Sequence, residues 1–213
     1  MKKIAVISQK GGAGKTTISI NLAIAALFDK KSTAIFDLDP QASACGWGDS
    51  RDNEMPAVVS CQSARLESML KTAEESEADL VILDTAPHSE SYALQAARLA
   101  DLIIIPCRPA TLDLRAINNT IDLASLAKTP AIVVFNAIPP NSRIGEEAIT
   151  LIKSQGIEVC STSLGQRISY VHSITAGQGV MEYEPSGKAA KEIKDLYKSI
   201  CKHVDMSIKR RVV

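Results

Sequence analysis

The sequence predicts a doubly wound α/β fold, with a mostly parallel sheet and helices on both of its faces. Two observations predict it: short, largely apolar segments recur along the 213 residues, and segments rich in helix-forming residues lie between them. Strands that are apolar on both faces are typical of parallel sheets covered by helices. Strand–helix alternation along the whole chain favours the doubly wound arrangement. No internal repeat or linker interrupts it, so we expect one domain over residues 1–213.

Six segments of three to five residues are the expected strands of the central sheet, and the weaker pattern of Ala57–Ser60 adds a further one. Because most of them carry no alternation of polar and apolar residues, we expect them to be buried on both faces. They are Ile4–Ile7, Thr33–Phe36, Leu80–Leu83, Leu102–Ile105, Ala131–Phe135 and Ile157–Val159.

The segments between these strands have helical patterns. Thr16–Phe28 places Ile18, Leu22 and Ala25 at i, i+4 and i+7, on one face of a helix. The other segments are rich in Ala, Leu and further helix-forming residues. The expected helices there are Arg65–Ala73, Ala93–Ala100, Leu114–Ala127 and Glu146–Ser154.

The C-terminal segment differs in charge from the rest of the chain. The whole chain has 24 basic and 24 acidic residues, whereas residues 188–213 have eight basic and three acidic ones. On a helix, the first five lysines of this segment fall on one face and apolar side chains on the other. This pattern indicates a helix docked on the sheet with a solvated lysine face; contact with nucleic acid or another anionic surface is the alternative.

The composition excludes several classes of protein. With 46% apolar and 23% charged residues, the chain is neither disordered nor fibrous, and its zero net charge does not imply wholesale binding of nucleic acid. The five cysteines are odd in number and form no C-x-x-C pair, so we expect reduced thiols and no disulfide framework. No apolar run is long enough for a signal peptide or a membrane span, so we expect a cytoplasmic protein.

The strongest motif is K-G-G-A-G-K-T-T at residues 10–17, between the first expected strand and the first expected helix. Glycines let backbone N–H groups curve around phosphate oxygens, and the helix N-terminus adds further donors. Lys15 is placed to reach the β- and γ-phosphates, and the Thr16 hydroxyl to hold Mg²⁺. We therefore expect ATP and Mg²⁺ to bind here. The residues expected to bind the nucleotide are Gly11, Gly12, Ala13, Gly14, Lys15, Thr16 and Thr17.

Three carboxylates follow the expected strands. Asp37 and Asp39 come after the second strand, and carboxylates at i and i+2 point to the same side of a strand end. Asp84 ends the apolar segment Leu80–Leu83, as the Walker B carboxylate of a P-loop protein does. A hard cation and a water molecule suit the Asp37–Asp39 pair. Asp84 is expected to hold Mg²⁺ with Thr16, directly or through water.

The P-loop departs from the strict pattern, because Gln9 stands where a glycine is usual and Lys10 lies inside the loop. This form, together with D-L-D-P-Q at residues 37–41, resembles the ParA/MinD family of deviant Walker A ATPases. The resemblance implies that Lys10 reaches the ATP of a partner subunit, so that the active species is a homodimer. It also implies that Asp37 lies near Mg²⁺ and that Asp39 positions the attacking water. The catalytic residues would then be Lys10, Lys15 and Asp39.

Two further positions resemble the family. Asn136, after the strand Ala131–Phe135, matches the residue that contacts the adenine base, although an Asn at a strand end is also a common turn residue. The region from Gly165 to Ala190 resembles the small plasmid-partition members typified by ParF. This implies that Arg167 and nearby lysines, Lys188 and Lys191, bind DNA without sequence preference in the ATP-bound dimer.

The resemblance implies a Mg²⁺-dependent ATPase that segregates plasmid DNA and associates with the nucleoid when ATP is bound. The expected partner is a small centromere-binding protein that stimulates hydrolysis, which should be slow alone because no arginine finger is evident. Since the P-loop strand starts at residue 2 or 3, we expect no N-terminal helix-turn-helix domain.

Two other classes of protein are alternatives. A MinD-like ATPase that cycles on a membrane would need bulky apolar residues in its tail, and His203–Val213 contains no Phe, Trp or Leu. P-loop enzymes with an iron–sulfur cluster need a cysteine close behind the Walker B segment, where Cys107 is the nearest. A dethiobiotin-synthetase-like ligase would not ordinarily carry Lys10.

Overall fold

The computed structural model describes residues 1–87, 89–140 and 143–208, and of residues 111–116 only the backbone. Its centre is a six-stranded sheet in the order β3-β2-β4-β1-β5-β6, and every pair of neighbours is parallel. The strands are β1 (Lys2–Val6), β2 (Thr33–Asp37), β3 (Ala57–Ser60), β4 (Leu80–Asp84), β5 (Leu102–Cys107) and β6 (Ala131–Phe135).

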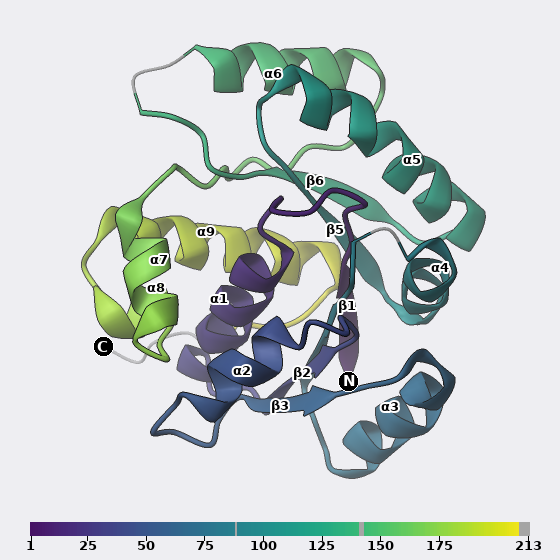
Figure 1. Cartoon of the computed structure of the whole chain (residues 1–213), viewed down its shortest axis with the longest axis vertical. Helices are drawn as coiled ribbons and strands as arrows, with labels where there is room; N and C mark the ends of the chain where they lie inside the picture. Colours follow the sequence, from purple (N-terminus) through teal and green to yellow (C-terminus); the bar gives the residue numbers. More distant parts are fainter. Residues whose placement is uncertain (88, 141–142, 209–213) are drawn as a thin grey trace.

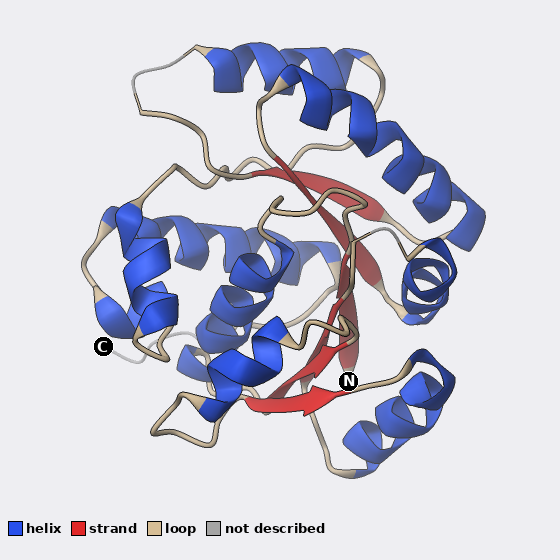
Figure 2. Ribbon diagram, in the orientation of Figure 1, coloured by secondary structure: helices blue, strands red, loops and turns tan. Residues whose placement is uncertain are grey.

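Helices cover both faces of this sheet (Figures 1 and 2). One face packs against α1 (Lys15–Phe28), α2 (Ser43–Asp49), α7 (Ile168–Thr175), α8 (Val180–Tyr183) and α9 (Lys188–His203). The other packs against α3 (Leu66–Glu75), α4 (Glu90–Leu99), α5 (Thr111–Ala127) and α6 (Ile144–Ser154), with the short 3-10 helix Ser63–Arg65 before α3. The predicted doubly wound fold is confirmed.

Successive side chains of each strand point to opposite faces of the sheet and pack in the two hydrophobic cores there. In β4, Leu80 and Ile82 pack under α1 and α9, whereas Val81 and Leu83 pack under the helices of the other face, and all four are almost fully buried. Burial on both sides explains why these strands are continuously apolar in the sequence.

One predicted strand is wrong. Ile157–Val159 forms only an isolated bridge between Val133 and Val159, so it lies beside the edge of β6 without becoming a strand of the sheet. Val133 makes two hydrogen bonds with the segment. The Val133 N–H donates to the Glu158 carbonyl, and the Val133 carbonyl accepts the Cys160 N–H. A turn with Gly156 at φ 76° precedes the segment. After Cys160 the chain next bonds to this edge at Leu164, whose N–H donates to the Phe135 carbonyl, so the contacts along β6 are separated and form no continuous strand.

The C-terminal helix α9 has the two faces that its sequence predicts. Ala189, Ile193, Leu196 and Ile200 are buried against the sheet and α1, and the lysines are exposed. None of the helices in the described ranges is long and apolar enough to span a membrane.

The parallel arrangement brings the polar strand ends to one edge. Asp37 at the end of β2 is in register with Asp84 at the end of β4, and Asp84 is in register with Val6 of β1. The loop that follows β1 therefore begins beside both carboxylates, and this edge carries the candidate site.

Candidate functional site

The P-loop joins β1 to α1 at the position that the motif predicts. Gly14 precedes the helix with φ 98°, a left-handed conformation that favours glycine, and its carbonyl accepts the N–H of Ile18 at 3.0 Å. A Cβ at this position would also collide with the side-chain amide of Asn136. The loop therefore depends on glycine for both its conformation and its packing.

The two P-loop lysines meet at the start of the loop. The buried Lys15 directs its Nζ toward the carbonyl oxygen of Lys10, 3.4 Å away. Burial lowers the pKa of Lys15, while the charges of Asp84 and Asp39 oppose that shift. Lys10 is half-buried and lines a small cavity with Ser8 and Arg108. Its contact with a partner subunit stays a prediction.

Asp84 lies buried behind the P-loop. Its Oδ1 accepts a hydrogen bond from the Ser19 hydroxyl of α1 at 3.1 Å, whereas its Oδ2 has no hydrogen-bond partner in the described part of the chain. Burial raises the pKa of Asp84 to about 7; the nearby Asp37 adds to this, and the hydroxyls of Thr16 and Ser19 oppose it. A buried carboxylate oxygen without a partner, with Thr16 beside it, fits a bound cation.

Asp37 has a structural task at the same edge. Its Oδ2 accepts the backbone N–H groups of Ala44 and Cys45 at 2.9 and 3.0 Å, in the first turn of α2, and its Oδ1 accepts the N–H of Asp39 at 3.1 Å. Asp37 thus holds both α2 and Asp39 in place. Asp39 lines the cleft described below, and its Oδ1 accepts the N–H of Gln41.

Asn136 joins β6 to the P-loop. Its Nδ2 donates to the carbonyl of Ala13 at 2.9 Å, its Oδ1 accepts the N–H of Ala137 at 2.8 Å, and its own N–H donates to the carbonyl of Cys107 at 2.8 Å. The side chain lines the cleft and positions the loop, and its contact with the adenine base stays a prediction.

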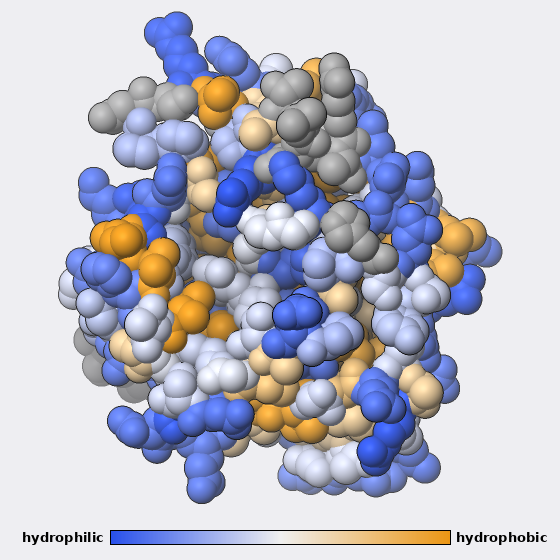
Figure 3. All heavy atoms as spheres, viewed as in Figure 1, coloured by the Kyte–Doolittle hydropathy of each residue, from blue (hydrophilic) through white to orange (hydrophobic). Residues whose placement is uncertain are grey.

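An open cleft of about 610 Å³ runs along this edge and brings most of the predicted residues together. Gly11, Gly12, Gly14, Lys15, Thr16, Thr17, Asp39 and Asn136 line it, with Arg108 and the segment Gly165–Arg167 on further walls. Tyr170 and Val171 of α7 also line it. Figure 3 shows apolar side chains gathered over α7, where Ile168 and Val171 are exposed.

Arg167 also lines this cleft, but a carboxylate engages it. Its Nε donates to Oε1 of Glu192 on α9 at 3.0 Å, and Oε2 of Glu192 accepts the Gly165 N–H at 3.2 Å and the Tyr170 hydroxyl at 3.3 Å. The other predicted DNA-binding residues, Lys188 and Lys191, are exposed on α9. The three cations therefore lie in one region, with Glu192 neutralising the arginine.

Several residues of the site were not predicted from the sequence, among them Ser19, Arg108 and Tyr170. Ser19 lies three residues after Thr16, a spacing that already places it on the same face of α1. Arg108 follows an apolar strand in the same way as Asp84, so its place at the sheet edge was readable from the sequence. Tyr170 gave no local signal, because α7 comes to the cleft only through tertiary packing.

The P-loop and the carboxylate-bearing strand ends agree with a comparison against protein families. The family described as the CobQ/CobB/MinD/ParA nucleotide binding domain matches residues 4–180.

Individual proteins match over nearly their whole length. The Maintenance of carboxysome distribution protein A of Halothiobacillus neapolitanus is 31% identical over 208 residues, which cover 92% of this chain and 95% of that protein. Protein ParA of Rhizobium radiobacter is 29% identical over 202 residues, covering 85% and 90%. A solved complex of a Cyanothece McdA variant with ATP has the same fold, with a TM-score of 0.78 at 17% identity over 100% of this chain and 99% of that one.

Proposed function

Because the chain belongs to the CobQ/CobB/MinD/ParA nucleotide-binding family, we propose that it is a Mg²⁺-dependent ATPase that segregates plasmid DNA. In this proposal ATP binding builds a homodimer that binds DNA without sequence preference, and hydrolysis releases it. A small centromere-binding protein stimulates the hydrolysis. The observation that carries the nucleotide chemistry is the P-loop cleft, which Lys15 and Thr16 line and behind which the buried Asp84 lies close to both.

The P-loop residues hold the phosphates. Backbone N–H groups from Gly11 to Thr17 and the N-terminus of α1 supply donors, and Lys15 supplies a charge at the β- and γ-phosphates. The Gly14 conformation and the Asn136–Ala13 hydrogen bond fix the loop before any ligand arrives. Such preorganisation lowers the entropy lost on binding.

Thr16 and Asp84 are the residues that would hold Mg²⁺. The partnerless Oδ2 of Asp84 and the Thr16 hydroxyl are hard oxygen donors of the kind that Mg²⁺ prefers. When bound, the ion neutralises charge on the phosphates. Asp37 fits a supporting position, because backbone N–H groups of α2 and of Asp39 already occupy both its oxygens.

Hydrolysis depends on orienting a water molecule and stabilising the transferred phosphoryl group. Asp39 lies on the cleft wall, where its carboxylate accepts the Gln41 N–H, and in this proposal it orients that water. Lys10 would reach the phosphates of the partner subunit's nucleotide. If Lys10→Ala kept normal turnover and ATP-dependent dimerisation, this trans role would be wrong.

The DNA contact rests on charge. Lys188 and Lys191 are exposed on α9, whose apolar face is buried, so the lysines are held in a row on a rigid element. Two such faces in a dimer would double the phosphate contacts available to duplex DNA. This arrangement explains how a chain of zero net charge could bind DNA only after dimerising.

The deciding experiment measures binding to duplex DNA of arbitrary sequence, with ATP, with ADP and without nucleotide, at two salt concentrations. We expect DNA binding only in the presence of ATP. Higher salt should weaken it, and so should the double substitution of Lys188→Gln and Lys191→Gln. As a control, Lys71→Gln and Lys128→Gln, exposed lysines on other surfaces, should leave binding nearly unchanged. No binding under any condition would contradict the DNA mechanism and direct attention to the membrane-cycling alternative, tested by liposome flotation with ATP.

A second cargo is favoured by the carboxysome-distribution relatives, which cover over nine-tenths of this chain. In that case the same ATPase would distribute a protein compartment over the nucleoid. Deleting the gene and measuring loss of the resident replicon per generation separates the two cargoes. Increased loss supports plasmid segregation, and unchanged loss with clustered compartments supports the second cargo.

A further inference from the structure

Arg108 is a cation in the nucleotide cleft that none of the roles above includes. It directly follows Cys107, the last residue of β5, and lines the cleft beside Gly12 of the P-loop. Its Nη2 lies 3.9 Å from the point that a Cβ on Gly12 would occupy. The guanidinium therefore lies against the phosphate-binding loop itself.

The backbone that carries Arg108 is fixed by the sheet. Cys107 and Pro109 on either side are buried, and the Cys107 carbonyl accepts the Asn136 N–H at 2.8 Å. Cys107 is also in register with Phe135 of β6. Arg108 itself is exposed, so its side chain projects from a rigid position into solvent at the cleft.

Among the side chains that the structure describes, no carboxylate pairs with the Arg108 guanidinium and no acceptor hydrogen-bonds to it. The other arginine of the cleft differs, because Glu192 engages Arg167. Arg51, away from the cleft, is likewise bound to Glu182. A guanidinium offers five donors in a plane that matches phosphate oxygens, and it stays protonated at physiological pH.

We propose that Arg108 binds the phosphate chain of a nucleotide held by the same subunit and so favours ATP over nucleotides with fewer phosphates. This inference rests on the proposed function, because it requires a nucleotide in the P-loop cleft. Arg108 also lines the small cavity that contains Lys10, and Lys15 points toward the Lys10 carbonyl. Cations thus gather at one end of the loop, where attraction grows with the number of phosphate charges.

The test compares Arg108→Gln and Arg108→Lys with the wild type, using fluorescent ATP, ADP and AMP at concentrations where sedimentation shows a monomer. We expect Arg108→Gln to weaken ATP binding about tenfold, since a charge-assisted hydrogen bond is lost, and AMP binding less than about twofold. Arg108→Lys should restore part of the ATP affinity. The unfolding midpoint should not change, because the side chain is exposed.

Arg98→Gln is the matched control, since Arg98 is exposed on α4 and does not line the cleft. It should leave all three affinities unchanged. An Arg108→Gln variant with the wild-type ratio of ATP to AMP affinity would overturn this inference alone. Failure of the wild type to bind any of the three nucleotides would overturn the proposed function, and this inference with it.

Discussion

The side-chain amide of Asn136 donates a hydrogen bond to the carbonyl of Ala13, which joins the end of β6 to a loop 123 residues earlier in the chain. The same amide occupies the space beside Gly14 that a Cβ would fill. The conformation of the phosphate-binding loop is thus held by its own glycines and by a strand on the far side of β5.

Removing this hydrogen bond should loosen the loop. We expect Asn136→Ala to lower the free energy of unfolding by about 1 kcal/mol and to weaken ATP binding about threefold to tenfold, because one buried acceptor loses its partner. Chemical denaturation and nucleotide titration measure the two effects. Asn118→Ala, at an exposed position of α5, is the control and should change neither. Unchanged ATP affinity in Asn136→Ala would show that the hydrogen bond does not position the loop.

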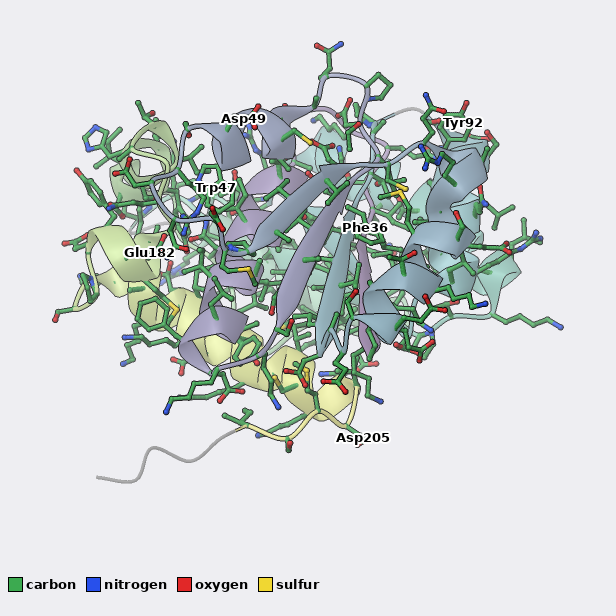
Figure 4. All side chains as sticks on the ribbon, turned by 90° about the horizontal axis from the view of Figure 1, so that it is seen from below. Phe36, Trp47, Asp49, Tyr92, Glu182 and Asp205 are labelled. Atoms are coloured by element: carbon green, nitrogen blue, oxygen red, sulfur yellow. The ribbon has the colours of Figure 1, made fainter. Side chains whose placement is uncertain are left out.

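Arg51, two residues after the end of α2, forms a salt bridge with Glu182 of α8. The Arg51 side chain is 3% exposed; its Nη2 lies 2.9 Å from Glu182 Oε1 and its Nη1 3.0 Å from Oε2. Nη1 also donates to the Gly177 carbonyl, and the guanidinium stacks 4.6 Å from the centre of the Trp47 ring. Figure 4 shows Trp47 and Glu182 at the same end of the molecule. This contact closes one side of the fold around α1.

Breaking this pair should destabilise the protein strongly. We expect Arg51→Met to lower the free energy of unfolding by about 3 kcal/mol, because a largely buried carboxylate loses its partner. Lys71→Met is the matched control: it breaks the exposed Lys71–Glu75 pair and should cost less than about 0.5 kcal/mol. A double-mutant cycle with Glu182→Gln measures the coupling. A loss as small as that of the control would show that the pair is not structurally important.

The sequence predicted the local features of the site better than its long-range contacts. The P-loop and the strand-end position of Asp84 depend on neighbours in the chain, and both were foreseen. The Arg167–Glu192 pair joins residues 25 apart on different elements, and nothing in the local pattern selects that carboxylate. The failed strand at Ile157–Val159 has the same cause, since strand pairing depends on how far the chain follows the edge of β6.

If Arg167 contacts DNA, Glu192 should lower the DNA affinity of the ATP-bound protein, because it engages the Arg167 guanidinium. We expect Glu192→Gln to release the guanidinium and to raise ATP-dependent DNA affinity severalfold, with a steeper dependence on salt. Asp195→Asn adds the same charge on the same helix without touching Arg167, since Asp195 pairs with Lys198 at 3.2 Å. DNA binding measured by anisotropy compares the two. Equal gains would mean that only net charge matters, and a gain that persists with Arg167→Ala would remove Arg167 from the DNA surface.

The ionisation of Asp84 should make the metal-free protein less stable as pH rises. Burial raises its folded-state pKa to about 7, against about 4 for an unfolded chain, so the native state binds more protons between these values. The contribution of Asp84 to the free energy of unfolding is therefore fully present below about pH 4 and is lost as pH rises through about 7. The free energy of unfolding should fall by up to about 4 kcal/mol over this range. Asp84→Asn has no charge to bury and should flatten this part of the pH profile.

Denaturation in EDTA at several pH values between 5 and 8 measures this effect. Above pH 7 we expect Asp84→Asn to be more stable than the wild type, whereas the exposed control Asp49→Asn should follow the wild-type profile. ATP hydrolysis by Asp84→Asn should be lost, because its side chain no longer offers a charged oxygen beside Thr16 to a cation. If Asp84→Asn is both active and no more stable than the wild type, then burying the Asp84 charge does not cost stability and Asp84 does not bind the metal. Gained stability with lost activity is the signature expected of a site that is strained until its ligand binds.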